Sequence, residues 1–172
     1  MRVIFLDIDG VVNTLQIYKE PPAHIPKEQL KLVEGYYVDI CSPSQKRVSN
    51  LQAVTILDKI CHEFNLKIVI SSTWRLGHYS ETIEALRKAG LSEDIEILGA
   101  TPNSPTHFRG EEIKTYLDMH KEIDDYIIFD DDDYDLYLLK DRLFKTDTFV
   151  GITFKTYIEV SAYFEEKNQK NT

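Results

Sequence analysis

Two carboxylates that lie two residues apart form the most reactive pattern near the start of the chain. Asp7 and Asp9 follow the apolar run 3–6 and precede Gly10, whose permissive backbone suits a tight turn. Carboxylates this close repel each other, and a divalent cation is the usual way to relieve the repulsion. One carboxylate then serves as a ligand while another attacks phosphorus or moves a proton. An Asp-rich turn after an edge strand has the same residue pattern, so the motif alone leaves both interpretations open.

A second acidic cluster follows another apolar run, 126–129. Four consecutive aspartates, 130–133, come directly after that run, and Asp135 closes the cluster. In an open parallel sheet the carboxyl ends of the strands lie at one edge, so this loop and the first one are expected to meet there. Four aspartates alone are more often a solvated charge run. Neither cluster is an EF-hand, since neither has Gly at its sixth position and Glu at its twelfth.

Hydroxyl and cationic side chains stand at the ends of two further elements. The apolar run 66–70 ends in Ser71 and Ser72, whose hydroxyls can donate to a phosphate oxygen beside backbone N–H groups. Ser is also a favoured helix N-cap, and one side chain can cap while its neighbour binds. Arg109 begins an amphipathic stretch and provides a cation that would balance the acidic pocket and a bound phosphoryl group.

In this order the motifs resemble the four motifs of the haloacid dehalogenase (HAD) superfamily. The matching residues are Asp7 to Gly10, Ser71, Arg109, and Asp130 and Asp131 with Asp135. More narrowly, similar runs occur in the small phosphatase-type domains of bacterial and phage RNA-repair proteins: 70–75, 101–102, 109–113, 130–132 and 146–147. The resemblance covers almost the whole chain. The superfamily usually has Lys at the third motif, so Arg109 departs from the pattern, and Lys114 is the alternative for that role.

The resemblance implies a catalytic role for four of these residues. Asp7 would be the nucleophile that forms an aspartyl-phosphate. Asp9 would protonate the leaving oxygen and later activate water. Ser71 would hold a phosphoryl oxygen, and Arg109 would steady Asp7 and neutralise charge on the transferring group.

The resemblance also implies a magnesium site and contacts with substrate. The Mg²⁺ ligands would be Asp7, the backbone carbonyl of Asp9, Asp130 and Asp131, with Asp135 in support. Gly10, Ser72 and Arg75 would contact the substrate. Superfamily members that hydrolyse phosphate esters carry an acid at the position of Asp9, whereas the dehalogenating branch does not, so a phosphatase or phosphotransferase is expected.

The elements that must position these residues alternate between strands and helices. Apolar residues at helical spacing predict a helix over 51–64. Further elements are predicted as a helix from Ser80 to near Gly90, a strand over 95–98, a helix over 109–121, a short strand over 144–147 and a helix over 157–167. The alternation predicts a single α/β domain over 1–172, with a three-layer, Rossmann-like parallel sheet and helices on both faces.

Residues 14–44 interrupt this alternation with prolines and a polar, tyrosine-containing mixture. In the superfamily, an insertion between the first two motifs shapes access to the pocket. This short insertion is expected to form a minimal cap that leaves the pocket open to large substrates. Trp74 and the tyrosines of the insertion either stack on a nucleobase or pack in the core and under the cap.

Charge and composition narrow the classes of function. The 172 residues carry a formal net charge of -9, which disfavours broad nonspecific nucleic-acid binding but not a nucleic-acid end held by Arg75, Arg109 and nearby lysines. Cys41 and Cys61 have no metal-ligand or disulfide spacing. Of the five histidines, His107 near Arg109 is the one to test. With no apolar stretch long enough for a membrane span, a soluble cytoplasmic protein is expected.

The sequence therefore predicts an Mg²⁺-dependent phosphomonoesterase that acts through Asp7 on a nucleotide or on the terminal phosphate of a nucleic acid. A phosphatase for small metabolites is the first alternative, and the acidic surface suits it. The second is a catalytically silent module that holds a cation or a partner in the acidic cleft. The presence of both Asp7 and Asp9 counts against a silent module.

Overall fold

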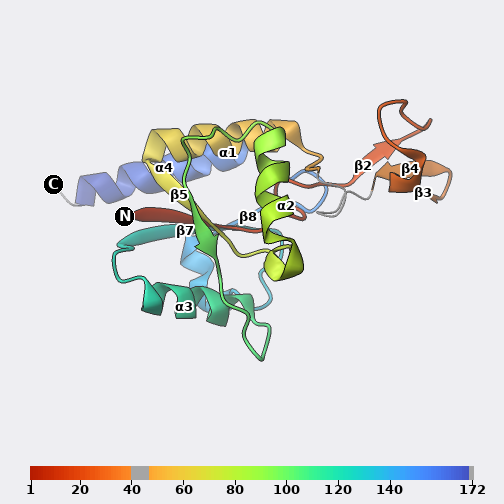
Figure 1. The fold of residues 1–172 in the computed structure, drawn as a ribbon. Helices are drawn as coiled ribbons and strands as arrows, with labels where there is room; N and C mark the ends of the chain where they lie inside the picture. Colours follow the sequence, from red (N-terminus) through yellow and green to blue (C-terminus); the bar gives the residue numbers. More distant parts are fainter. Residues whose placement is uncertain (40–46, 171–172) are drawn as a thin grey trace.

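A five-stranded parallel sheet forms the centre of the molecule in a computed structural model that describes residues 1–39 and 47–170 (Figure 1). The strand order is β6-β5-β1-β7-β8, and every neighbouring pair is parallel. The strands are β1 (Arg2–Leu6), β5 (Leu66–Ile70), β6 (Ile97–Ala100), β7 (Asp125–Asp130) and β8 (Leu143–Lys145). The predicted Rossmann-like sheet is confirmed.

Helices cover both faces of this sheet, as predicted. Alternate side chains of β1 face opposite sides: Ile4 and Leu6 enter one core cluster, and Val3 and Phe5 enter the other. Because β1 is buried on both faces, its sequence is continuously apolar. The first cluster includes residues of α1 (Leu51–Phe64), α2 (Arg75–Lys88) and α4 (Phe154–Lys170); the second includes residues of α3 (Arg109–Met119) and the 3₁₀ helix η3 (Tyr137–Arg142).

A local signal explains the start of α1. The side chain of Asn50 accepts a hydrogen bond from the Ala53 N–H and caps α1, the helix predicted over 51–64. The prediction for α2 was wrong at its start, since the helix begins at Arg75 rather than Ser80. The difference is one turn after Trp74 that ends in a kink at residues 76–78, where Gly77 has φ +82°.

The described part of the insertion forms a separate antiparallel sheet in the order β2-β4-β3. Its strands are β2 (Gln16–Tyr18), β3 (Leu30–Val33) and β4 (Tyr36–Asp39), and the 3₁₀ helix η1 (Lys27–Gln29) precedes β3. We call these strands the small sheet. It projects beyond the main sheet on the side of α2 (Figure 1). Residues 40–44 of the expected insertion, including Cys41, lie outside the described residues.

Two further observations concern sequence expectations. Cys61 is buried in α1, and this burial, with a smaller effect of Asp58, raises the pKa of its thiol to about 12. Within the described residues, no helix combines the length and the apolar character needed to cross a membrane.

Candidate active site

The carboxyl ends of three neighbouring strands bring the sequence motifs together. The backbone N–H of Asp7 donates to Phe129 O at 3.0 Å, and that of Ser71 donates to Leu6 O at 2.9 Å. The ladder thus continues one residue beyond β1 and β5, which fixes where the first two motifs begin. One carboxylate oxygen from each of Asp7, Asp130 and Asp131 lies within 4.8 Å of the others. The predicted convergence of the two acidic loops is therefore present.

The turn after Asp7 depends on Gly10. Gly10 has φ +71°, and a Cβ added there would lie 2.2 Å from Asp131 Oδ2. A side chain at this position would therefore displace the Asp131 carboxylate. The hydroxyl of Thr148 donates to the same oxygen at 2.6 Å. Absence of a side chain at position 10 is what lets the third carboxylate reach the cluster.

Residues from the last third of the chain complete this turn. The hydroxyl of Thr146 donates to Gly10 O at 2.7 Å, and the backbone N–H of Ile152 donates to Val11 O at 2.9 Å. Thr146 follows β8, the edge strand next to β7. The turn is therefore supported by chain that lies more than 130 residues away in sequence.

The carboxylates of the cluster carry more negative charge than their neighbours balance. Asp7 and Asp130 are both buried. Burial raises the pKa of Asp7 against the opposing effects of Arg109 and Ser72. Burial, followed by the charge of Asp7, raises the pKa of Asp130 to about 7, although Arg109 opposes this. A cluster of oxygen ligands with excess negative charge fits a hard divalent cation.

Arg109 is the cation that contacts these carboxylates, and Lys114 is not. Arg109 Nη1 lies 3.2 Å from Asp7 Oδ2 and also donates to Asp130. Burial disfavours the charge on Arg109, but the carboxylates outweigh this effect and raise its pKa. The Arg109 backbone N–H donates to Asp135 Oδ2 at 2.6 Å, so Asp135 holds the first turn of α3. Gly110 lets this turn approach closely, since a Cβ there would lie 2.4 Å from Asp135 O.

Asp9 lies at the exposed mouth of the site and is held by two donors. Asn13 Nδ2 donates to Asp9 Oδ1 at 2.7 Å, and Trp74 Nε1 donates to Asp9 Oδ2 at 2.8 Å. Trp74 is itself buried. Of the two roles considered for it, stacking on a nucleobase and packing in the core, its position therefore agrees with packing. The indole contact with Asp9 was not predicted from the sequence.

Two buried hydroxyls stand at the ends of β5 and β6 without a hydrogen-bond partner among the described residues. They belong to Ser71 and Thr101. An unsatisfied buried hydroxyl costs roughly 1–3 kcal/mol, and each of these two keeps a donor that a ligand atom could accept. Ser72, also buried, accepts a hydrogen bond from the Trp74 backbone N–H at 3.3 Å and contributes to lowering the pKa of Asp7.

Arg75 has its guanidinium engaged within the protein. Its Nη2 forms an ion pair with Glu112 at 2.5 Å, and both side chains are buried. Its remaining hydrogen bonds go to four backbone carbonyls, those of Ser71, Ser72, Thr101 and Pro102. Arg75 thereby ties the loop after β5 to the loop after β6 and to α3.

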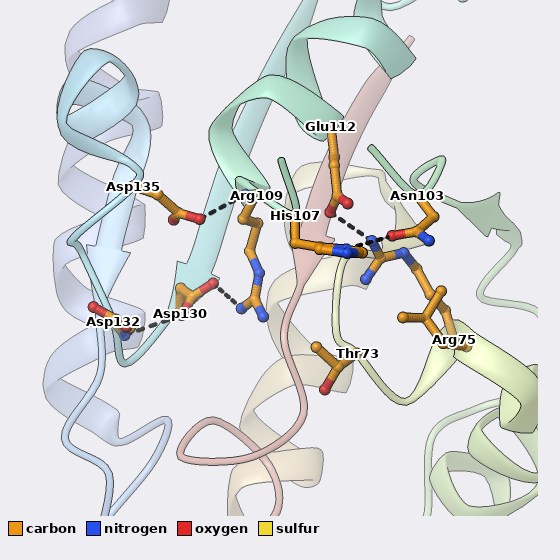
Figure 2. A pocket seen from close by; sticks show the side chains of 10 residues that line it. Thr73, Arg75, Asn103, His107, Arg109, Glu112, Asp130, Asp132 and Asp135 are labelled. Carbon is orange, nitrogen blue, oxygen red and sulfur yellow. Dashed lines mark hydrogen bonds and ion pairs between the residues drawn. The ribbon is translucent and has the colours of Figure 1, made fainter. Parts of the chain in front are cut away.

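A cavity of about 100 Å³ lies between the Arg109–Asp130 contact and the Arg75–Glu112 ion pair. In Figure 2, Arg109 reaches Asp130 on one side of it, and the Arg75–Glu112 pair lies on the other. His107 stands on the wall and shares a hydrogen bond of 3.0 Å with Asn103. His107 also has φ +56°, which is uncommon for a residue with a side chain. The cavity suits a group the size of a phosphoryl moiety.

Residues 3–156 match the family model described as the HAD domain in Swiss Army Knife RNA repair proteins. The chain belongs to this HAD family. No curated protein and no solved structure matches the chain. The part matched by the HAD model runs from β1 into the first turn of α4 and contains every site residue described above. At the level of the family, this indicates phosphatase-type chemistry in an RNA-repair context.

Proposed function

We propose that the chain is an Mg²⁺-dependent phosphomonoesterase that acts through Asp7 on the terminal phosphate of a nucleotide or nucleic acid. The observation that carries this proposal is the position of the buried Asp7 carboxylate. It lies in contact with Arg109 and beside the second acidic loop, at the edge of the sheet where ligands of open α/β folds bind. The family match supports the chemistry and the RNA-repair context.

The carboxylates of Asp7, Asp130 and Asp131 would hold the Mg²⁺ ion, together with the backbone carbonyl of Asp9 that the resemblance implies. When bound, the ion supplies positive charge that orients the phosphoryl group and stabilises its transfer. The remaining chemistry belongs to side chains of the chain itself.

Two carboxylates divide the proposed reaction between them. In the first half, an Asp7 oxygen attacks phosphorus, the bond from phosphorus to the leaving oxygen breaks, and Asp9 gives its proton to that oxygen. In the second half, Asp9 takes a proton from water as the water oxygen attacks the aspartyl-phosphate. This step releases inorganic phosphate and restores Asp7. Asn13 and Trp74 hold Asp9 in place for both proton transfers.

Three further residues would hold the phosphoryl group or the elements around it. Arg109 neutralises charge on the transferring group and steadies Asp7, and the unpartnered Ser71 hydroxyl donates to a phosphoryl oxygen. For Arg75 we propose a positioning role in place of a direct contact with substrate, because its guanidinium hydrogen bonds go to Glu112 and backbone carbonyls. Gly10 would serve mainly by admitting Asp131.

A panel of phosphate esters tests this proposal. We would measure phosphate release from 3′- and 5′-phosphorylated oligonucleotides, mononucleotides and sugar phosphates, with Mg²⁺ and with a chelator. Asp7→Asn is expected to lower turnover by roughly 10³-fold or more, as loss of a nucleophile does in other enzymes. The matched control is Asp133→Asn, because Asp133 is exposed in the same acidic loop and pairs with Lys145.

The panel also separates the alternatives. Release from mononucleotides or sugar phosphates but not from oligonucleotide ends would favour a small-metabolite phosphatase, which the net charge of -9 suits. Release that persists in Asp7→Asn would contradict the nucleophile assignment. No release from any ester, with Mg²⁺ still binding, would favour a silent cation-binding module.

A further inference from the structure

A second and larger hollow adjoins the cavity of about 100 Å³ beside Arg109 and Asp130, which we call the catalytic cavity. It has a volume of about 500 Å³ and lies between the first turns of α3 and the segment 134–138, a size within the usual range for ligand pockets. Three aromatic rings line it and, unlike rings of the core, are largely open to solvent: Phe108 is 46% exposed, Tyr137 66% and Tyr134 80%. We call this hollow the aromatic groove.

The aromatic groove lies next to the candidate active site and shares one lining residue with its cavity. Asp135 lines both hollows. Phe108 lies between His107 and Arg109, which both line the catalytic cavity. The contact of Asp135 with the first turn of α3 lies between the two hollows, so a group in the aromatic groove would lie across this contact from a phosphate in the cavity.

The backbones that carry these rings are fixed by hydrogen bonds. The Tyr134 N–H donates to Asp132 Oδ1 at 2.9 Å, and Phe108 is the residue that precedes α3. Tyr137 is the first residue of η3. A fixed backbone lowers the conformational entropy that binding costs, although the exposed rings still lose rotamer freedom when a flat ligand stacks on them.

The charges of the aromatic groove favour a neutral ligand group over another phosphate. Glu111 and Asp135 are its acids, and both are engaged, with Thr106 and the Arg109 N–H respectively. Lys114 is its cation and has no ion pair among the described residues. A nucleobase is neutral and flat, and it offers amino groups and acceptors to such side chains.

We infer that the aromatic groove binds the nucleobase of the terminal nucleotide when a single-stranded nucleic-acid end places its phosphate beside Asp7. This inference rests on the proposed function and adds a substrate class to it, since sugar phosphates have nothing to place in the groove. Stacking accepts every base, so the subsite selects nucleotides without reading their sequence.

Binding tests the inference independently of turnover. Fluorescence anisotropy would follow short labelled oligoribonucleotides with a 3′- or 5′-phosphate binding to the full chain that carries Asp7→Asn. The added double substitution Tyr134→Ala and Tyr137→Ala is expected to raise the Kd about tenfold or more, from the worth of stacked bases. The pair Tyr134→Phe and Tyr137→Phe should keep the affinity, because it keeps the rings.

A matched control lies on the other face of the sheet. Phe154 is 62% exposed at the start of α4, and Phe154→Ala should change neither the Kd nor turnover. With Asp7 intact, the double alanine variant should lower kcat/KM about tenfold on phosphorylated oligonucleotides and leave kcat/KM on ribose 5-phosphate unchanged.

The outcomes separate this inference from the proposed function. Equal losses on oligonucleotides and on ribose 5-phosphate would overturn the inference, as would an unchanged Kd. A change in oligomeric state without a change in Kd would overturn it too and would identify a self-association surface. The protein could hydrolyse no ester while the double alanine variant still binds oligonucleotides more weakly than the parent chain. That result would support the groove and contradict the proposed function.

Discussion

The carboxyl edge of the main sheet and the small sheet differ in how closely their residues are packed. At the main edge, Asp7 and Asp130 are buried and Gly10 has no room for a side chain. In the small sheet, Leu32 is 62% exposed, and nothing lies within 4 Å of a Cβ added at Gly35. The comparison indicates that the proposed chemistry depends on positions fixed by packing, while the small sheet is a tolerant surface.

A pair of matched glycine substitutions tests whether packing is what distinguishes the main edge from the small sheet. Gly10→Ala is expected to lower turnover about a hundredfold, since displacing Asp131 disturbs the proposed metal site. Gly35→Ala has a similar φ, +85°, and should cost about 1–2 kcal/mol of backbone strain without loss of turnover. Phosphate release and thermal unfolding would measure both effects. Equal losses of turnover in the two variants would show that packing is not what separates the regions.

A second pair of substitutions compares the buried acid–arginine contacts of the two regions. Glu112→Ala should lower the free energy of unfolding by roughly 3–5 kcal/mol, because Arg75 is left charged and buried. Asp39→Ala should cost about 1–2 kcal/mol, because its partner Arg47 is 33% exposed and reaches water. Urea titration would give both values.

The turnover of the same two variants, Glu112→Ala and Asp39→Ala, tests the difference between the regions further. Glu112→Ala is expected to slow the folded enzyme, since Arg75 also holds the loop that carries Ser71. Asp39→Ala should leave the rate of the folded protein unchanged. A slower Asp39→Ala enzyme would make the small sheet part of the catalytic structure.

The response to Mg²⁺ should depend on pH at the main edge. In the folded protein without metal, the pKa of Asp130 is raised to about 7 from its ordinary value of 3.8, so its contribution to stability falls as pH rises toward 7. Mg²⁺ needs the ionised carboxylate, so its apparent affinity should be about tenfold higher at pH 8 than at pH 6. Thermal shifts at fixed Mg²⁺ would measure this, with Asp133→Asn as the control. Equal shifts at both pH values would contradict it.

The smallest effect is expected in the small sheet. Leu32→Ser should change stability by less than about 0.5 kcal/mol, as exposed substitutions usually do. Turnover on sugar phosphates should stay the same. A higher KM confined to oligonucleotides would instead assign the small sheet to the substrate-binding surface, as the expected cap role proposes.

The acidic core of the site was predictable from the sequence because it depends on where strands end. Asp7, Ser71 and Asp130 each come at the end of an apolar run, and parallel strands bring such positions to one edge. The helices predicted over 51–64 and 109–121 are present as α1 and as α3, which ends at Met119, because apolar residues at helical spacing are a local signal. Local patterns thus defined most elements and the acidic core of the site.

Contacts between distant side chains were not predictable in this way. Arg75 was expected to contact substrate, but its partner Glu112 lies 37 residues away, and no local pattern encodes that ion pair. The Trp74 contact with Asp9 spans 65 residues. Thr146 belonged to a run shared with the RNA-repair domains, and that was the available signal for its contact with Gly10.

The bonds from Thr146 to Gly10 and from Ile152 to Val11 have a consequence for protein synthesis. Asp7 and Asp9 are translated well before Thr146 and Ile152, which complete the turn after them. Domains fold as their chain emerges, so a nascent chain that still lacks Thr146 and Ile152 has the proposed nucleophile but not the contacts that hold it in a working site. We expect ribosome-bound fragments that end before Ile152 to be inactive, with the proposed activity beginning only after Ile152 has emerged.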